Sequence, residues 1–444
     1  MPSILYPNFS FFSLELSTLT PIDIYKWMCY KVYGIEDPSQ TDQPLLRSSS
    51  VAYWKKAISY FMNTTSKWNE VAKTGNPTQS KMINTLIKVV KKCETRGTGA
   101  ESQTDRAFTI MEFRQLLDLI PEDRYKAMMN FQYHLMGRCD DTAHVKKQVL
   151  MASTEFHGYL TTKIVWSKNV IDSQNCPEQI LIPSMDTKTC AYLSLATWLE
   201  QWIQHGDGAL SQWLFCEGTT TNTSSTKEQD EEALNGKRCY ARAIKRAIDN
   251  QAFEKACPGK LGSHSIRKLS VTEARRQGVS KDDIDYRARW SAKRMQDQYT
   301  DIQLNWPDVN AASKLCQDGA CRYIIKREAV GVSDEWLCTN VTPNISSAFD
   351  RRVGAILARP LLWAAFDPTW SEMVAPEIRH RIISAFIRLE CIDIDDGVNP
   401  VSRVEVIASE GNDGNALFDY VDRIYRLTRF CLPNLISWRQ GQLG

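Results

Sequence analysis

The chain has 444 residues, a formal net charge of +2 and a hydrophobic fraction of 43%. This length favours two or three domains, and the composition is that of an ordinary soluble globular protein. The small net charge excludes a protein that is basic over its whole surface, so any charge that binds nucleic acid must be local. Thirteen cysteines without a repeated spacing argue against a disulfide framework or a zinc set and favour reduced thiols.

No uncharged stretch is long enough to cross a bilayer, and no Lys or Arg precedes Lys26. A secretory signal needs a basic start followed by an apolar core, so the N-terminal residues argue against one. We therefore expect a soluble protein with no membrane contact.

Residues 1–94 predict a small helical domain. Thr20 and Pro21 have the residue types of a helix start, and Ser50 has that of a second cap. A third helix is expected near 80–93, because its apolar residues recur every three to four positions. Its end carries a basic cluster of Lys88, Lys91 and Lys92. Such a cluster is equally typical of a solvated helix face and of a DNA-binding surface.

Residues 95–106 contain two glycines and few apolar residues, which predicts an interdomain linker. Thr109 and Glu112 then form the sequence pattern of a capping box for the next helix. A further helix is expected to open at Pro121 and to reach Arg138.

From about residue 150 the pattern favours strands. Residues 159–166 are rich in β-branched and aromatic side chains, and residues 179–183 predict a second short strand. Lys168 falls in a turn candidate between them. Between Lys237 and Lys268 there are nine basic and two acidic residues, which predicts a local basic surface. The candidate DNA-binding residues in this stretch are Arg242, Lys245, Arg246 and Lys268.

Residues 304–444 predict a mostly helical C-terminal domain, with helical periodicity near 345–359, 376–390 and 416–430. No repeat and no strong basic run is present there. We therefore expect this domain to contact protein more than DNA.

The most specific pattern in the chain is H-x2-R-x22-W-x8-Y, formed by His264, Arg267, Trp290 and Tyr299. By chance it should occur in roughly one sequence of this length in a few thousand. Arg267 lies one helical turn from His264, so both side chains can face one pocket. A phenol can attack a phosphate, a guanidinium can clamp its oxygens, and an imidazole near its pKa can move a proton. Tyr286 is a weaker nucleophile candidate, because it falls within the intervening helix.

This pattern resembles the C-terminal signature of the tyrosine recombinases, the phage-integrase family. In that family a His-x-x-Arg pair precedes a His or Trp, and the nucleophilic Tyr follows nine residues later. The residues before Trp290 read DIDYRAR, which departs from the usual Leu-Gly ending of bacterial integrases. This departure suggests a eukaryotic branch similar to the crypton transposons.

The resemblance implies further site residues. Arg138 would be a second phosphate clamp and Asp141 a supporting carboxylate. Lys168 would protonate the departing 5′-oxygen, with Lys163 as its competitor. Trp290 would donate a hydrogen bond to the phosphate, and Tyr299 would be the nucleophile.

The resemblance also implies the architecture. It predicts a mainly α fold with a small antiparallel β-sheet in the catalytic domain. Residues 1–94 would be a helical core-binding domain that clamps DNA, 95–106 the linker, 107–303 the catalytic domain and 304–444 a helical extension. The implied activity is site-specific recombination or transposition by a homotetramer on double-stranded DNA in the nucleus, with no metal or other cofactor.

Three other readings fit parts of the sequence. A type IB topoisomerase has a similar site but rejoins the original strand as a monomer. A domesticated transposase would keep DNA binding without catalysis. A purely structural helical scaffold would use none of the site residues, and the four-residue spacing argues against it.

Overall fold

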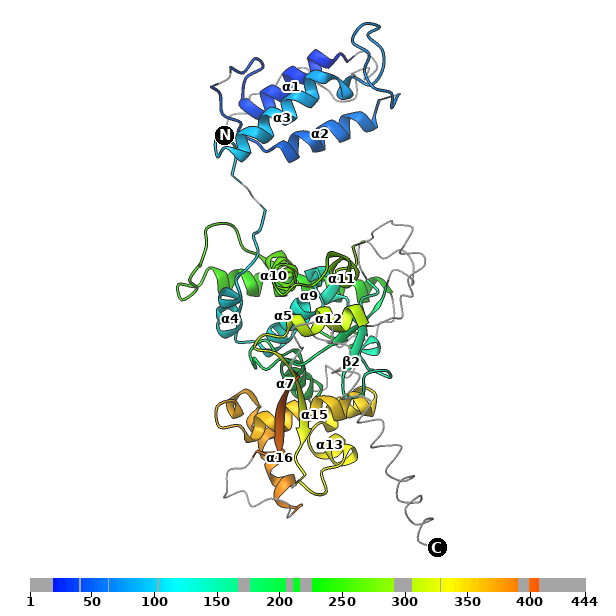
Figure 1. Ribbon diagram of the computed structural model, residues 1–444, viewed down its shortest axis with the longest axis vertical. Helices are drawn as coiled ribbons and strands as arrows, with labels where there is room; N and C mark the ends of the chain where they lie inside the picture. The colour runs from blue at the N-terminus through cyan, green and yellow to red at the C-terminus, as the bar shows by residue number, and fades with distance from the viewer. Residues whose placement is uncertain are drawn as a thin grey trace. The chain divides into compact units, whose positions relative to one another are not determined.

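The structure is a computed structural model in which the chain divides into two compact units, Met1–Thr104 and Asp105–Gly444 (Figure 1). The part of the chain that the structure describes is mainly helical with two small antiparallel sheets, which confirms the predicted fold class at this coarse level. Among the described residues, no helix is both long enough and apolar enough to cross a membrane. The described residues are 19–39, 41–62, 64–101, 104–166, 176–204, 211–215, 226–290, 306–327, 329–389 and 399–406.

Within its described residues, the first unit has three α-helices around one small core: α1 (Pro21–Tyr33), α2 (Ser48–Tyr60) and α3 (Lys81–Thr95). Thr20 caps α1 through a reciprocal pair of hydrogen bonds with Asp23, as its sequence predicts. The buried apolar side chains that join the three helices are Ile24, Met28, Cys29, Val32, Val51, Ile83, Leu86 and Val90.

Helix α2 begins two residues earlier than the expected cap at Ser50. The carboxylate of Glu94, on α3, accepts the backbone N–H of Ser48 and pairs with Arg47 at 3.3 Å. A side chain from another helix therefore accepts a free backbone N–H at the start of α2. A capping pattern in the local sequence does not reveal such a contact.

In the second unit, α4 (Ile110–Leu119) begins with the expected capping box between Thr109 and Glu112. Helix α5 (Asp123–His134) ends earlier than predicted. Met136 adopts a positive φ of 49°, and the N–H of Gly137 donates to the carbonyl of Gln132. This left-handed turn ends the helix, so Arg138 lies at the start of the short helix α6 (Cys139–Ala143) and not at the end of α5.

Three antiparallel strands follow in the order β1-β2-β3: Met151–Ala152, Leu160–Lys163 and Glu178–Leu181. The register pairs Thr162 with Gln179 and Lys163 with Glu178. The two strands expected from the sequence are therefore present and adjacent, although β2 and β3 are shorter than the predicted ranges.

Helix α7 (Ala191–Gln204) is almost entirely buried, and α9 (Thr226–Ile248) carries Arg242, Lys245 and Arg246 of the predicted basic surface. Two helices follow that bear the sequence motif, α10 (Ser263–Arg276) and α11 (Lys281–Arg287). Gly278 ends the first of these with φ +81°, and Ser280 caps the second through the N–H of Asp283.

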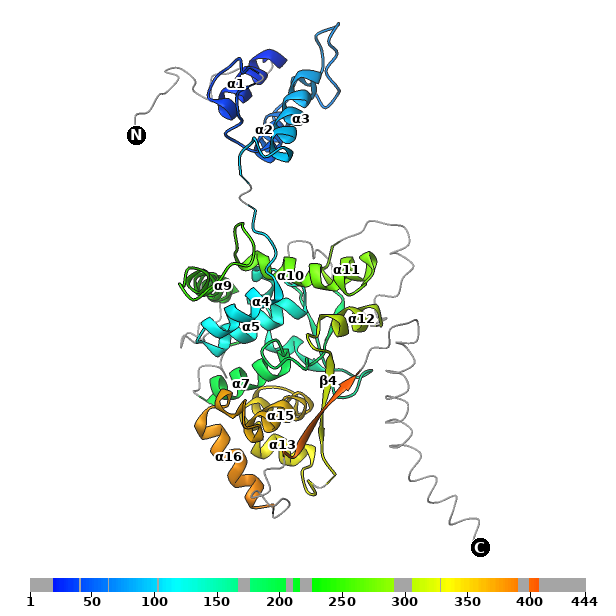
Figure 2. The ribbon, with the colours of Figure 1, turned by 60° about the vertical axis from the view of Figure 1, so that its left-hand side comes forward.

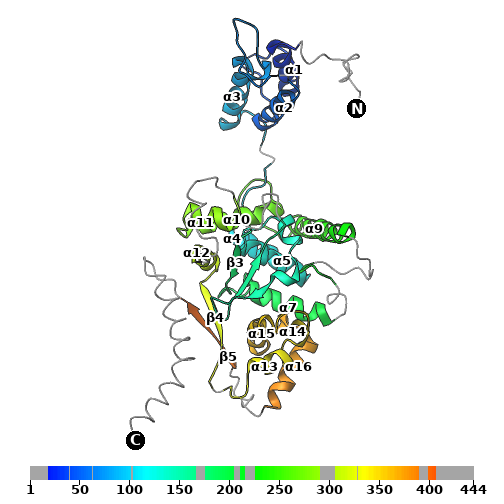
Figure 3. The same cartoon turned by 90° about the vertical axis from the view of Figure 1, so that its right-hand side faces the viewer.

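The described residues beyond 304 belong to the same unit as the motif. They form α12 (Trp306–Leu315), α13 (Asp334–Asn340), α14 (Pro343–Ala348), α15 (Arg351–Phe366), α16 (Pro376–Ile387) and a sheet of β4 (Ala320–Ile325) with β5 (Val401–Val406). One buried apolar cluster runs from Phe108 to Val401. Figures 2 and 3 show α15 lying beside α7.

A buried carboxylate fastens this C-terminal part to α7. Glu200 accepts the N–H groups of Asn344 and Ile345 at the start of α14, and it pairs with Arg381 at 2.6 Å. The expected separate domain at 304–444 thus shares its described core with the expected catalytic domain.

Candidate active site

Helix α10 presents two of the four motif residues. Arg267 is buried on this helix, whereas His264 is exposed one turn earlier. The helix starts at Gly262, where a Cβ would lie 2.7 Å from a carboxylate oxygen of Asp105. The segment entering the second unit thus packs closely against the start of α10, and the N–H of Arg106 donates to the carbonyl of Lys260 at 2.8 Å.

The carboxylate of Asp141 lies at the centre of three guanidinium groups. Its Oδ2 is 3.7 Å from Nη1 of Arg138, 3.6 Å from Nη1 of Arg267 and 3.6 Å from Nη2 of Arg289. The same oxygen accepts the backbone N–H of Arg138 at 3.1 Å. We call Asp141 and these three arginines the arginine cluster. It brings together two predicted clamps and the predicted carboxylate from α6, α10 and the end of α11.

Three guanidinium groups of the cluster share the buried carboxylate of Asp141. Nη1 of Arg267 is buried without a hydrogen-bond partner, while Nη2 donates to the carbonyl of Ala288 at 2.6 Å. Burial, followed by the charges of Arg289 and Arg138, lowers the pKa of Arg267 to about 9. Such a group is stabilised by a bound anion, and phosphate matches the guanidinium geometry.

Trp290 and His264 lie near the cluster and are exposed to solvent. The guanidinium carbon of Arg267 is 5.5 Å from the ring centroid of Trp290, and Trp290 is 40% exposed. Partial desolvation of the ring, followed by the nearby cations of Arg267 and Lys268, lowers the pKa of His264. The imidazole is therefore neutral at neutral pH and able to accept a proton.

Two residues that support the cluster were not foreseen from the sequence. Gln132 on α5 donates to the carbonyls of Gly137 and Ser263 and accepts the hydroxyl of Tyr240 at 2.7 Å. It thereby joins the loop before Arg138 to the start of α10. No local pattern in the sequence distinguishes this glutamine from a solvated one.

Arg289 is the second unforeseen residue. It lies directly before Trp290, and its side chain is fully buried. The guanidinium donates to the side-chain oxygen of Gln179 on β3 and to the carbonyls of Leu135 and Arg287. The only signal in the sequence was its position beside Trp290, where an arginine at a helix end is usually solvated.

The two residues assigned the central chemical steps, Lys168 and Tyr299, lie outside the described residues. Lys163, the alternative to Lys168, is on β2 and pairs with Glu178 on β3 at 3.7 Å. Its ammonium group is therefore engaged across the strand pair.

The predicted DNA-binding residues are mostly exposed. Lys88, Lys91 and Lys92 lie on the surface of α3, and Arg242 and Lys245 lie on that of α9. Two others have partners in the second unit: Arg246 pairs with Glu122 at 3.3 Å, and Lys268 donates to the carbonyl of Asp105.

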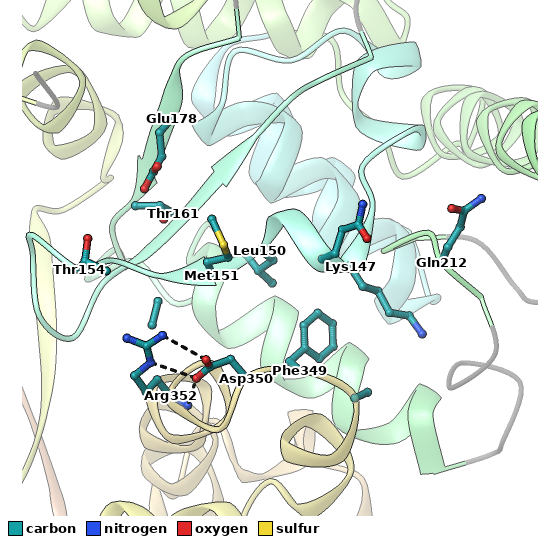
Figure 4. Close-up of a pocket in the computed structure, with 13 residues that line it drawn as sticks. Lys147, Leu150, Met151, Thr154, Thr161, Glu178, Gln212, Phe349, Asp350 and Arg352 are labelled. Carbon is teal, nitrogen blue, oxygen red and sulfur yellow. Dashed lines mark hydrogen bonds and ion pairs between the residues drawn. The ribbon is translucent and has the colours of Figure 1, made fainter. Parts of the chain in front are cut away.

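A cavity of about 540 Å³ lies elsewhere in the second unit (Figure 4). Met151, Thr161 and Glu178 line it from the sheet, Phe349 lines it from the end of α14, and Arg352 lines it from the start of α15. None of its lining residues belongs to the arginine cluster. Arg352, which lines the cavity, donates two hydrogen bonds to the neighbouring carboxylate of Asp350.

Within the described residues, no group of three or more His, Cys, Asp or Glu side chains is placed to hold a metal ion. No protein-family model matches the chain, and neither does any curated protein sequence.

Proposed function

We propose that this protein is a tyrosine site-specific recombinase that breaks and rejoins DNA strands, and that it acts in transposition of a crypton-like element. The observation that carries the proposal is the arginine cluster. Arg138 and Arg267, assigned as phosphate clamps on sequence alone, both lie within 3.7 Å of the predicted carboxylate of Asp141, and Nη1 of Arg267 is buried without a hydrogen-bond partner. A non-bridging oxygen of a scissile phosphate would accept a hydrogen bond from that nitrogen.

The chemistry follows from the residue types. The phenol oxygen of Tyr299 attacks the phosphorus, the bond from phosphorus to the 5′-oxygen breaks, and Lys168 gives that oxygen a proton. A 3′-phosphotyrosyl bond and a free 5′-hydroxyl result. A 5′-hydroxyl of the partner strand then attacks the phosphotyrosine and releases Tyr299, so the energy of the original bond is kept.

The remaining residues would stabilise the transition state. Arg138 and Arg267 bind the non-bridging oxygens, where negative charge develops during attack. The indole N–H of Trp290 donates a further hydrogen bond, but an indole does not transfer protons at neutral pH. The imidazole of His264, which its lowered pKa keeps unprotonated, takes the proton from the phenol as it attacks.

The proposal extends to the assembly. Unit Met1–Thr104 would be the core-binding domain and would hold the duplex together with the catalytic domain, residues 107–303. Exchange between two duplexes needs four sites, which a homotetramer supplies. The residues after 304 would contact protein, and a DNA substrate in a eukaryote places the enzyme in the nucleus.

The test is a trapping assay on the full chain with nicked duplexes of randomised sequence in EDTA. A nick beside the cleavage point lets a short fragment diffuse away, so the covalent intermediate accumulates. We expect a denaturation-resistant protein–DNA adduct that is abolished by Tyr299→Phe and retained by the matched variant Tyr286→Phe. An adduct that persists in Tyr299→Phe would contradict the assignment of the nucleophile.

The other outcomes separate the alternatives. Binding to duplex DNA with no adduct in the wild-type protein would indicate a DNA-binding relic. Relaxation of supercoiled plasmid by a monomer at low protein concentration, without strand exchange, would indicate a type IB topoisomerase.

A further inference from the structure

Gln132 is a buried glutamine on α5 that bridges the two segments carrying the predicted phosphate clamps. Its Nε2 donates to the carbonyl of Gly137 at 3.2 Å and to the carbonyl of Ser263 at 3.0 Å. Gly137 directly precedes Arg138 in the chain. Ser263 is the first residue of α10, the helix that carries Arg267. One amide group therefore joins two segments that are far apart in the sequence.

The orientation of this amide follows from the two carbonyls. Both of them only accept hydrogen bonds, so the NH2 end of the side chain must face them. The amide oxygen points the other way and accepts the hydroxyl of Tyr240, on α9, at 2.7 Å. A reversed amide would place its oxygen against two carbonyl oxygens, which would repel it. The bonds to the two carbonyls therefore do not depend on the hydroxyl of Tyr240.

Each accepting carbonyl belongs to a peptide unit that leads into a residue of the candidate site. The carbonyl of Gly137 is in the peptide unit before Arg138, and the carbonyl of Ser263 is in the peptide unit before His264. Because a peptide unit is planar, fixing its oxygen also fixes the direction in which the next residue continues. The amide thus constrains the backbone at both sides of the site.

The separation of these two segments decides whether two guanidinium groups can bind the same anion. Nη1 of Arg138 and Nη1 of Arg267 lie 3.7 Å and 3.6 Å from one carboxylate oxygen of Asp141, so both groups reach the same anionic oxygen. Nη1 of Arg267 is buried without a hydrogen-bond partner and can donate to a bound phosphate. In a site of this kind a misplacement of about 1 Å can lower the rate about 100-fold.

We propose that Gln132 is a positioning residue of a phosphate site: its amide sets the distance between the segment of Arg138 and helix α10, so that Arg138 and Arg267 bind the same phosphate. This inference rests on the proposed function for the identity of that phosphate as a DNA phosphodiester. The binding of a phosphate anion by the two arginines does not depend on that identity, and it is measured separately in the second experiment.

The first experiment is single-turnover trapping of the covalent adduct by the full chain at saturating nicked duplex. The amplitude of adduct formation measures the fraction of folded protein, and the rate constant measures the reaction itself. Gln132→Met keeps an unbranched side chain of similar length but removes the donors and the acceptor. We expect it to lower the rate constant about 100-fold.

Tyr240→Phe is the matched control, because it also leaves a buried polar atom of Gln132 without its partner but keeps both bonds to the carbonyls. It should react at close to the wild-type rate constant. A wild-type rate constant in Gln132→Met, whatever its amplitude, would show that the residue only stabilises the fold and would overturn the proposal. An equal loss of rate constant in the two variants would overturn it as well.

Gln132→Glu is a second variant of the same size, and it makes the bridge depend on pH. Its carboxyl group donates to one carbonyl when it is protonated and to none when it is ionised. Burial raises the pKa of such a carboxyl above its ordinary value of about 4.3. We expect its loss of rate constant, relative to the wild-type protein, to be smaller at about pH 5 than at about pH 8. An equal loss at both pH values in folded protein would overturn the proposal.

The second experiment measures the melting temperature in inorganic phosphate against chloride at equal ionic strength. We expect phosphate to raise the melting temperature of the wild-type protein and of Tyr240→Phe, and to raise that of Gln132→Met much less. Equal stabilisation of Gln132→Met would overturn the inference. A wild-type protein that shows this phosphate response but forms no DNA adduct would contradict the proposed function and leave the role of Gln132 standing. A wild-type protein that shows neither would overturn both.

Discussion

Arg287 and Asp308 form an ion pair in which neither side chain is exposed to solvent. The pair connects the end of α11 with the start of α12, on either side of the segment that contains Tyr299. Arg287 also donates to the carbonyls of His134 and Ile180, and Asp308 accepts the N–H of Ile180. The two helices that flank the segment with Tyr299 are thus fixed to α5 and β3 through one buried network.

Removal of Asp308 should strongly destabilise the second unit. Asp308→Ala would leave the charge of Arg287 buried without its counter-ion and the N–H of Ile180 without an acceptor. Breaking a buried ion pair in this way costs about 3–5 kcal/mol. Urea unfolding of the full chain measures the loss. The control is Asp334→Asn, which breaks an exposed pair with Arg359 and should cost less than about 1 kcal/mol.

The carboxyl group of Glu112 makes the free energy of unfolding of the second unit depend on pH. Burial raises the pKa of this carboxyl, but hydrogen bonds from Arg106 and from the N–H groups of Thr109 and Ala256 outweigh burial, and the pKa falls to about 2. A carboxylate whose folded pKa lies below its unfolded value of about 4.3 stabilises the fold above that value. This stabilisation is lost as the pH falls from about 4.3 to about 2.

The Glu112→Gln variant should therefore be less stable than the wild-type protein at neutral pH, and the difference should shrink as the pH falls. One proton bound on unfolding corresponds to at most about 1.4 kcal/mol per pH unit. Urea unfolding at steps between pH 6 and pH 2 measures this slope. The exposed Glu377→Gln serves as control. A stability difference that stays constant over this range would show that the pKa of Glu112 is the same in the folded and the unfolded protein, which contradicts the prediction.

The sequence predicted features that depend on neighbours in the chain. Thr20 and Thr109 cap helices through residues three positions away, so the pattern is local and visible. The pair of His264 and Arg267 on one helix was visible for the same reason. In contrast, α5 ends at His134 because Met136 takes a positive φ, and a methionine in the sequence does not predict that conformation.

Long-range contacts account for the features that were not predicted. Arg289 enters the site because Gln179 on another element holds it, and α2 starts at Ser48 because Glu94 on α3 caps it. The C-terminal part joins the core through Glu200 and Arg381, which are 181 residues apart. Periodicity and capping rules contain no information on such pairs.

The assignment of the proton donor can be tested by changing the leaving group. A 5′-bridging sulfur leaves as a thiolate without a proton, so a variant that lacks the general acid should recover on that substrate. We expect Lys168→Ala to slow cleavage of ordinary DNA by about 100-fold or more and to cleave the sulfur-containing DNA almost like the wild-type protein. The rate of adduct formation on the two substrates measures the effect.

Lys163→Ala is the matched control for that test, because Lys163 pairs with Glu178 on the neighbouring strand. It should have little effect on either substrate. Suppose that Lys163→Ala recovered its rate on the sulfur-containing DNA and Lys168→Ala did not. The general acid would then be Lys163 and not Lys168.

The basic face of α9 should contribute to binding without selecting a sequence. Arg242 and Lys245 are exposed on this helix, and each phosphate that they neutralise releases counterions from the duplex. The double variant Arg242→Ala with Lys245→Ala should reduce the slope of log affinity against log salt by about 1.8. Because phosphates carry no sequence information, affinity should fall equally for all duplexes tested. Fluorescence anisotropy over a salt series measures both quantities.

The control variant is Arg351→Ala. It removes an exposed arginine at the start of α15, which pairs with Glu335, and it should leave the slope unchanged. An unchanged slope in the α9 double variant would place the DNA on another face.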